Sequence, residues 1–234
     1  MNSQSNEKGG PTRKIQPPDG YPPEPGRYLR GNDLSPVAVC VILKWPDDGI
    51  PPEIENLVRV GVETGAALSG TLQTENIGIE KMICNLVANP NIRYLIICGP
   101  ESPGHLTGEA VMALNANGVD GKRRIVGSQA LTPFLSNIAL ESIERFQRQV
   151  RIVDLLNEGD PRLLQDAVRA CYQEEPVLFQ GQQLCDPGAF PAEPLVVPIT
   201  WRIQKPWAVP QDDKEQAAVE RMHALVDRLR RKKE

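Results

Sequence analysis

Short apolar runs rich in β-branched residues alternate along this chain with amphipathic segments of helical spacing. The longest uninterrupted run, residues 37–43, is too short for a helix of its own and predicts a buried strand. Residues 93–98 predict a second buried strand, residues 65–70 a weaker one, and residues 124–126 and 152–156 two short ones. Because amphipathic segments separate these runs, we expect a doubly wound (Rossmann-like), mostly parallel α/β sheet with helices on both faces.

Four helices are expected from apolar stripes that carry start or stop signals, over residues 74–87, 106–118, 140–150 and 161–172. Thr74 can cap the first of these helices. Asp160 can cap the last one, and Pro161 suits its first position.

Prolines gather in the two flanks of the chain, which favours extended segments there. We therefore expect an extended N-terminal arm at residues 1–35, one α/β domain at 36–184, a Pro-rich segment at 185–210 and a charged helix at 211–234. That last helix carries a narrow apolar seam of Val219, Met222, Val226 and Leu229. The seam fits either a solvated terminal helix or one that binds a partner.

Charge and composition exclude several classes of function. A net charge of −4 and an aromatic content of 5% argue against nucleic-acid binding. With no 18-residue apolar run and no signal peptide, we expect no membrane insertion and a cytoplasmic location. The five cysteines include no CxxC pair, which predicts reduced thiols and no disulfide framework. The sequence leaves a homo-oligomer open.

Nucleotide and zinc sites are also disfavoured. The chain has neither GxGxxG after a strand nor GxxxxGK[ST], which argues against NAD and ATP. Its two histidines, His105 and His223, are too far apart in sequence to form a local ligand pair.

One histidine, His105, lies between glycines and prolines in the segment that follows the strand at residues 93–98. In a doubly wound sheet, ligands bind at loops that leave the carboxyl ends of strands. We therefore expect the loops at residues 99–108 and 127–133 to form the functional edge. An imidazole there suits a structural role, a proton carrier, or a ligand to a metal ion that a cofactor brings, and the residues alone leave these three open.

Several sequence blocks are similar to one known family. They are TENIGIEK at 74–81, NPNIRYLII at 89–97, PGHLTGEA at 103–110, GVD at 118–120, RIVG at 124–127 and ERFQ at 144–147. In this order they resemble the A subunit of tetrahydromethanopterin S-methyltransferase over about residues 36–160. Membrane-anchored members of that family carry a C-terminal transmembrane helix, whereas this chain ends in Arg-Arg-Lys-Lys-Glu. The resemblance therefore implies a soluble homologue.

The resemblance implies a corrinoid (cobalamin) carrier that shuttles a methyl group from a pterin donor to an acceptor, together with a separate pterin-dependent methyltransferase partner. The family's lower cobalt ligand maps onto His105, which becomes the candidate catalytic and metal-binding residue. The alternative is an interaction or regulatory subunit that kept the fold without the corrinoid.

Around His105, the candidate cofactor-binding residues are Gly99, Ser102, Pro103, Gly104, Thr107 and Gly108, with Thr74, Glu75, Asn76, Gly127 and Ser128 on neighbouring segments. Thr107 suits a helix cap or a hydrogen bond to a corrin amide, and the segment from Thr74 to Asn76 suits either helix capping or lining of the site. Glu101 and Glu109 are candidates to orient the second imidazole nitrogen, or are simply solvated.

Overall fold

The computed structural model describes residues 14–44, residues 49–172 and isolated positions between residues 213 and 224. The predicted Pro-rich segment at 185–210, the apolar seam of the C-terminal helix and His223 lie outside the described residues. No helix in the described part of the chain is long and apolar enough to cross a membrane.

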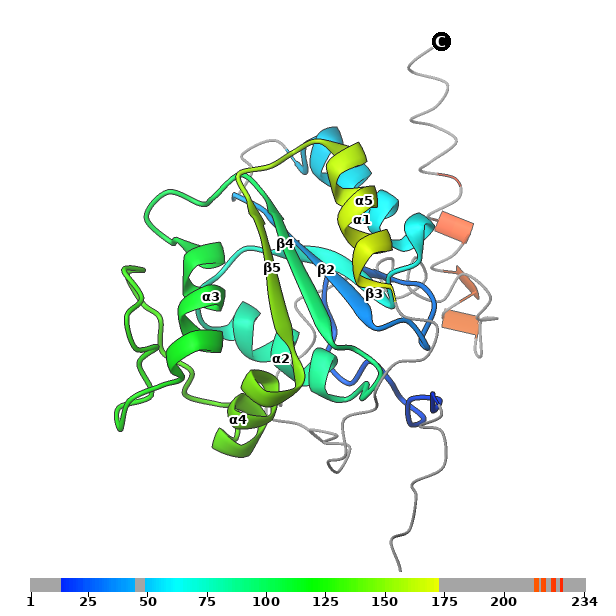
Figure 1. Cartoon of the computed structure of the whole chain (residues 1–234). Helices are drawn as coiled ribbons and strands as arrows, with labels where there is room; N and C mark the ends of the chain where they lie inside the picture. Colours follow the sequence, from blue (N-terminus) through cyan, green and yellow to red (C-terminus); the bar gives the residue numbers. More distant parts are fainter. Residues whose placement is uncertain are drawn as a thin grey trace, which may run out of the picture.

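A five-stranded sheet forms the centre of the fold (Figure 1). Its strands, in spatial order, are β1 (Tyr28–Arg30), β3 (Leu68–Leu72), β2 (Val37–Ile42), β4 (Tyr94–Gly99) and β5 (Arg151–Leu156). β1 pairs antiparallel with β3, and all the other pairs are parallel. The predicted doubly wound, mostly parallel sheet is confirmed.

Five helices cover the two faces of this sheet. α1 (Pro52–Thr64) and α5 (Pro161–Cys171) pack on one face, and α2 (Ile77–Val87), α3 (Thr107–Asn117) and α4 (Leu140–Gln149) on the other. Alternate residues of β2 point into the two cores, Val39 toward α1 and Cys40 toward α2. Every residue of β2 is therefore buried, which explains its uninterrupted apolar run.

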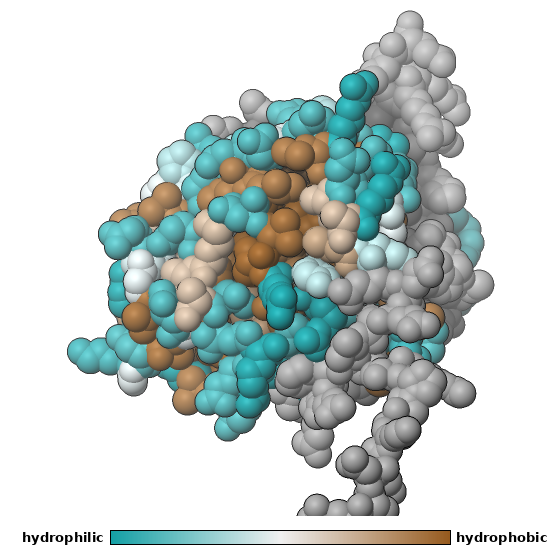
Figure 2. All heavy atoms as spheres, viewed as in Figure 1, coloured by the Kyte–Doolittle hydropathy of each residue, from teal (hydrophilic) through white to brown (hydrophobic). Residues whose placement is uncertain are grey.

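The outer strand β5 pairs only with β4 among the described residues. In the view of Figure 2, apolar side chains gather over β5 between α3 and α5. Arg151 and Asp154 on this strand are exposed, and charged side chains of this kind discourage further strand pairing at an edge.

The prediction of a sheet strand at residues 124–126 is wrong. Arg124 and Ile125 form isolated antiparallel bridges to Phe134 and Val119, within the irregular segment of residues 118–139 that joins α3 to α4. The Asp120 carboxylate accepts hydrogen bonds from the backbone N–H groups of Lys122 and Arg124, which closes a local turn. Local pairing therefore satisfies the backbone of this short run, and it does not join the sheet.

Two elements were not predicted, β1 and α1. The signal for α1 was present, because Ile54, Leu57, Val58 and Gly61 follow helical spacing and are buried. β1 carries no apolar run; its residues are only partly buried, and it is a strand because it pairs with β3.

The order in which the chain adds strands to the sheet reverses beside β2. Sheets of this type bind their ligands at the point where that order reverses. From β2 the chain crosses to β3 on one side, and it later returns to β4 on the other. The loops at residues 73–76 and 99–106 leave the carboxyl ends of β3 and β4 at this same edge. His105 lies on the second of these loops.

Candidate functional site

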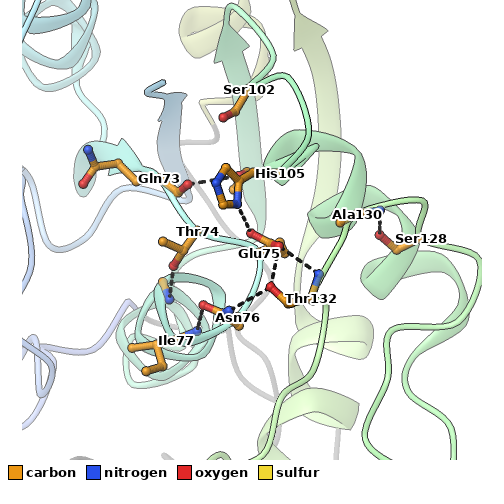
Figure 3. Close-up of polar contacts among 12 residues, drawn as sticks. Gln73, Thr74, Glu75, Asn76, Ile77, Ser102, His105, Ser128, Ala130 and Thr132 are labelled. Carbon is orange, nitrogen blue, oxygen red and sulfur yellow. Dashed lines mark hydrogen bonds and ion pairs between the residues drawn. The ribbon is translucent and has the colours of Figure 1, made fainter. Parts of the chain in front are cut away.

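The side chain of His105 is held by a carboxylate from the neighbouring loop (Figure 3). Nδ1 of His105 lies 2.8 Å from Oε2 of Glu75. The Glu75 side chain is 1% exposed, whereas that of His105 is 54% exposed. A buried carboxylate thus holds one edge of an imidazole that is about half exposed as a whole.

The Glu75 carboxylate has partners at both oxygens. Oε1 accepts hydrogen bonds from the backbone N–H (3.0 Å) and the hydroxyl (2.7 Å) of Thr132, in the segment between α3 and α4. Burial acts to raise the pKa of Glu75. Hydrogen bonds from Thr132, from its own backbone N–H and from His105 nevertheless hold that pKa below its usual value. Glu75 is therefore ionised at neutral pH and can only accept hydrogen bonds.

This pairing decides the tautomer of neutral His105. Because the carboxylate only accepts, Nδ1 must carry the hydrogen, and Nε2 keeps its lone pair. Within the described residues Nε2 has no hydrogen-bond partner. An imidazole fixed at Nδ1 by a carboxylate, with Nε2 free, is the usual arrangement of a metal-ligating histidine.

The loop that carries His105 is fixed at both ends. Glu101 accepts hydrogen bonds from the N–H groups of Ser102, Gly108 and Glu109, and so caps the start of α3. Leu106 donates its N–H to the Ser102 carbonyl at 2.8 Å and adopts the left-handed conformation, with φ of 43°. These contacts hold a strained turn directly beside His105.

Glu101 and Glu109 do not orient His105, which corrects the prediction for both. Glu101 caps α3. Glu109 accepts hydrogen bonds from the Ser128 hydroxyl (2.8 Å) and the Gln129 N–H (3.1 Å). The helix start and the neighbouring segment offer these carboxylates closer donors than the imidazole.

Thr107 is neither a cap nor an exposed donor. It is fully buried, and its hydroxyl donates to the Gln73 carbonyl at 3.3 Å, which ties the two loops together. Gly108 is close-packed, because a Cβ at this position would lie 2.5 Å from Cδ1 of Leu156. Gly99 ends β4, with φ of 84°. The roles of these three residues in the structure are therefore ones of packing and backbone geometry.

The start of α2 closes the other side of the site. α2 begins at Ile77, later than predicted, and Asn76 directly precedes it. The cap was predicted at Thr74, but the N-cap residue is Asn76, whose Oδ1 accepts from the Ile77 N–H; the Thr74 hydroxyl accepts from the Gly78 N–H in the first turn, at 2.9 Å. Nδ2 of Asn76 donates to the Thr132 hydroxyl at 3.4 Å and joins the network around Glu75.

The remaining predicted residues divide into two groups. Pro103 and Gly104 are exposed in the turn that presents His105, while the buried Ser102 forms its base. Gly127 and Ser128 contact other parts of the fold: Ser128 binds Glu109, and a Cβ at Gly127 would lie 3.0 Å from Nδ2 of Asn117. Figure 3 shows Ser128 turned away from His105.

Apolar side chains and a cavity adjoin the site. Leu131 is 72% exposed and Ile77 is 42% exposed. Cδ1 of Leu131 would lie 3.9 Å from a Cβ at Gly104. A cavity of about 760 Å³ opens on the far side of the loop after β3, where Gln73, Thr74, Asn76 and Ile77 form part of its wall.

No group of three or more His, Cys, Asp or Glu side chains that could hold a metal ion occurs among the described residues. Among the described residues His105 can thus supply one nitrogen ligand, which suits a metal ion that arrives with other ligands of its own. A metal held in a macrocycle arrives in this way.

Comparisons with known proteins identify the family of this chain. A family described as the A subunit of tetrahydromethanopterin S-methyltransferase matches residues 14–205, well beyond the 36–160 expected from the sequence blocks. The first of two such proteins named in Methanothermobacter thermautotrophicus is 41% identical over 80% of this chain and 69% of its own length. The second of the two in Methanothermobacter marburgensis is 39% identical over 77% of this chain and 86% of its own length. Its counterpart in Methanobrevibacter ruminantium is 37% identical over 77% and 83%.

The match covers most of the chain and includes every segment that builds the His105 site. The protein therefore belongs to the family formed by the A subunit of tetrahydromethanopterin S-methyltransferase, which is a component of a methyltransferase complex.

Proposed function

We propose that this chain is the corrinoid-binding methyl carrier of a methyltransferase system, with Nε2 of His105 as the lower axial ligand of cobalt. The observation that carries the proposal is the contact between His105 Nδ1 and the buried Glu75 carboxylate, which leaves Nε2 of the neutral, exposed imidazole side chain unprotonated. A corrinoid supplies a cobalt centre that accepts and releases methyl groups. The chain would supply the axial nitrogen and its orientation.

The surroundings of His105 suit a large flat ring. The turn at Pro103 and Gly104 is exposed, and Gly104 has no side chain that would obstruct an approaching macrocycle. Leu131 presents apolar surface beside it, because Cδ1 of Leu131 would lie 3.9 Å from a Cβ at Gly104. A ring that covered this side chain would gain hydrophobic contact in addition to the axial bond.

The methyl donor site belongs on a partner. Activation of a methyl-pterin requires a proton donor placed on the pterin. The carboxylates of Glu75, Glu101 and Glu109 all accept hydrogen bonds from the fold itself. This engagement supports a separate pterin-dependent methyltransferase, from which a methyl group passes to the carrier and then to an acceptor.

Reconstitution with cobalamin tests the axial ligand. We expect the loaded protein to show the visible spectrum of a histidine-ligated corrinoid and His105→Ala to lose it, because loss of the axial nitrogen changes the ligand field. Added free imidazole should restore the spectrum of His105→Ala. The matched control is His223→Ala, which changes the protein's other histidine and should behave as wild type.

Two results would overturn the proposal. One is the absence of cobalamin binding by the wild-type chain, which would favour an interaction or regulatory subunit. The other is an unchanged spectrum in His105→Ala. The need for a partner is tested separately, by following methyl transfer from methyl-tetrahydromethanopterin with and without a pterin-dependent methyltransferase.

A further inference from the structure

We propose that Thr132 is a positioning residue of this site, which acts through Glu75 to hold His105 in the tautomer that leaves Nε2 unprotonated. The inference rests on the proposed function only for what Nε2 then binds. Thr132 makes no hydrogen bond to His105; its side chain bonds Glu75 and Asn76, and its backbone N–H also donates to Glu75.

Thr132 fixes the carboxylate at two points. Its N–H and its hydroxyl both donate to Oε1 of Glu75, at 3.0 and 2.7 Å, while Oε2 faces His105 Nδ1 at 2.8 Å. A carboxylate bound twice at one oxygen cannot rotate without breaking both bonds, so Oε2 stays in line with the imidazole. Hydrogen bonds to a charged acceptor are the stronger kind, and this acceptor is buried.

The direction of the Thr132 hydroxyl is also set. Asn76 donates from Nδ2 to the Thr132 oxygen at 3.4 Å, so the hydroxyl proton is left to point at Glu75. The order of donation is therefore Asn76 to Thr132 and Thr132 to Glu75, with His105 donating from the other side. Figure 3 shows these side chains converging from three separate segments of the chain.

The segment that carries Thr132 is anchored independently of the site. Both oxygens of the buried Glu80 carboxylate accept hydrogen bonds from Asn137, at 2.8 Å from its backbone N–H and 2.9 Å from Nδ2. The Pro133 carbonyl accepts from the Ile125 N–H at 2.8 Å. These contacts hold residues 125–137 against α2, so Thr132 approaches Glu75 from a fixed backbone.

Nitrogen NMR of the apoprotein gives a test that needs no corrinoid. The chain has only two histidines, so ¹⁵N-histidine labelling yields the ring-nitrogen signals of two imidazoles, and His105→Ala assigns each set to its residue. The chemical shifts of the two ring nitrogens report the tautomer at a pH where the ring is neutral. We expect wild-type His105 to be protonated at Nδ1, and the ratio of the Nδ1–H to the Nε2–H form to fall by about threefold or more in Thr132→Val.

Thr132→Ser is the matched variant, because it keeps the hydroxyl and loses the methyl group that Thr132→Val keeps. It should restore the wild-type ratio. Thr132 is exposed and Val has nearly its shape, so both variants should fold, and the His223 signal serves as an internal reference. A wild-type tautomer ratio in Thr132→Val, or a loss in Thr132→Ser equal to that in Thr132→Val, would overturn the inference.

Coordination of diaquacobinamide, a corrinoid without a lower base of its own, separates this inference from the proposed function. We expect Thr132→Val to weaken histidine ligation about tenfold and Thr132→Ser to match wild type. If wild type fails to ligate the corrinoid while the tautomer still depends on the Thr132 hydroxyl, the proposed function fails and the positioning role stands. If wild type ligates and Thr132→Val does so equally well, the positioning role fails alone.

Discussion

The carboxylate of Glu101 accepts a hydrogen bond of 2.8 Å from the backbone N–H of Glu109, eight residues farther along the chain. This bond closes the loop that presents His105 onto the first turn of α3. Because the N–H groups of a first helical turn have no partners inside the helix, a carboxylate placed there satisfies them and also favours the helix dipole. The same carboxylate therefore caps the N-terminus of α3 and fixes the loop that carries His105.

Glu101→Ala should destabilise the fold by about 1–2 kcal/mol, the range found when a helix cap is removed. Because the loop loses its closure, His105 should also ligate cobalamin less completely. Urea denaturation and the visible spectrum of the loaded protein measure these two effects. The control is Glu144→Ala, an exposed position in α4 with no polar contact in the described structure, which should stay within about 0.5 kcal/mol of wild type. A Glu101→Ala protein as stable as the control would contradict the capping role.

Sequence patterns predicted the two strands that are buried on both sides, β2 and β4, and failed for β1, which pairing alone makes a strand. β2 and β4 are continuous apolar runs because helices cover both faces of the sheet, so periodicity was enough to find them. β1 has no such pattern. It is a strand because Tyr28 pairs with Gly70 of β3, a contact across 42 residues that no local signal reveals.

Gly70→Ala should detach β1 from the sheet. A Cβ at Gly70 would lie 2.5 Å from Cβ of Tyr28 and 2.7 Å from the Arg27 carbonyl oxygen, both too close to be relieved without moving β1. We expect a loss of about 1–3 kcal/mol in the free energy of unfolding, as for other overpacked positions, and faster amide exchange in residues 28–30. Gly121→Ala is the control, because a Cβ there has no neighbour within 4 Å. Equal stability of the two variants would rule out this close approach.

Only part of the candidate site could be predicted from the sequence. The Gly-Pro setting of His105 and its place after β4 identified the histidine, and Glu75 was among the expected site residues. The choice of Glu75 over Glu101 and Glu109 as the partner of His105 depends on which carboxylates the helix starts and neighbouring segments already occupy. Thr132 lies in the loop at residues 127–133 that was expected at the functional edge, but nothing singled it out, because its partner Glu75 is 57 residues away in the sequence.

Gln149 is expected to be essential for stability at the opposite end of the sheet. This buried side chain donates from Nε2 to the carbonyls of Leu86, Asn89 and Ile92, and its Oε1 accepts from Nε of Arg145. Gln149→Leu removes all of these bonds at similar volume, and should cost about 1–3 kcal/mol because buried polar groups lose a partner. Urea denaturation checks this, with Glu144→Gln as the exposed control on the same helix. Wild-type stability in Gln149→Leu would contradict it.

The cysteines of the two cores should be inert in the folded protein. Cys40, Cys84 and Cys98 are buried, and burial raises the pKa of Cys98 to about 12 and that of Cys40 well above its usual value. Since the thiolate is the reactive form, the raised pKa values keep Cys40 and Cys98 protonated at neutral and mildly alkaline pH, while Cys84 is protected by its burial. In a Cys171→Ser, Cys185→Ser variant, only these three thiols remain. We expect a thiol reagent to label none of the three in the native protein and all three in urea.

Raising the pH from about 7 to about 9 should accelerate native labelling far less than it accelerates labelling of an exposed cysteine with a pKa near 8.5. Labelling of any of the three before global unfolding would show that one of the two cores opens locally.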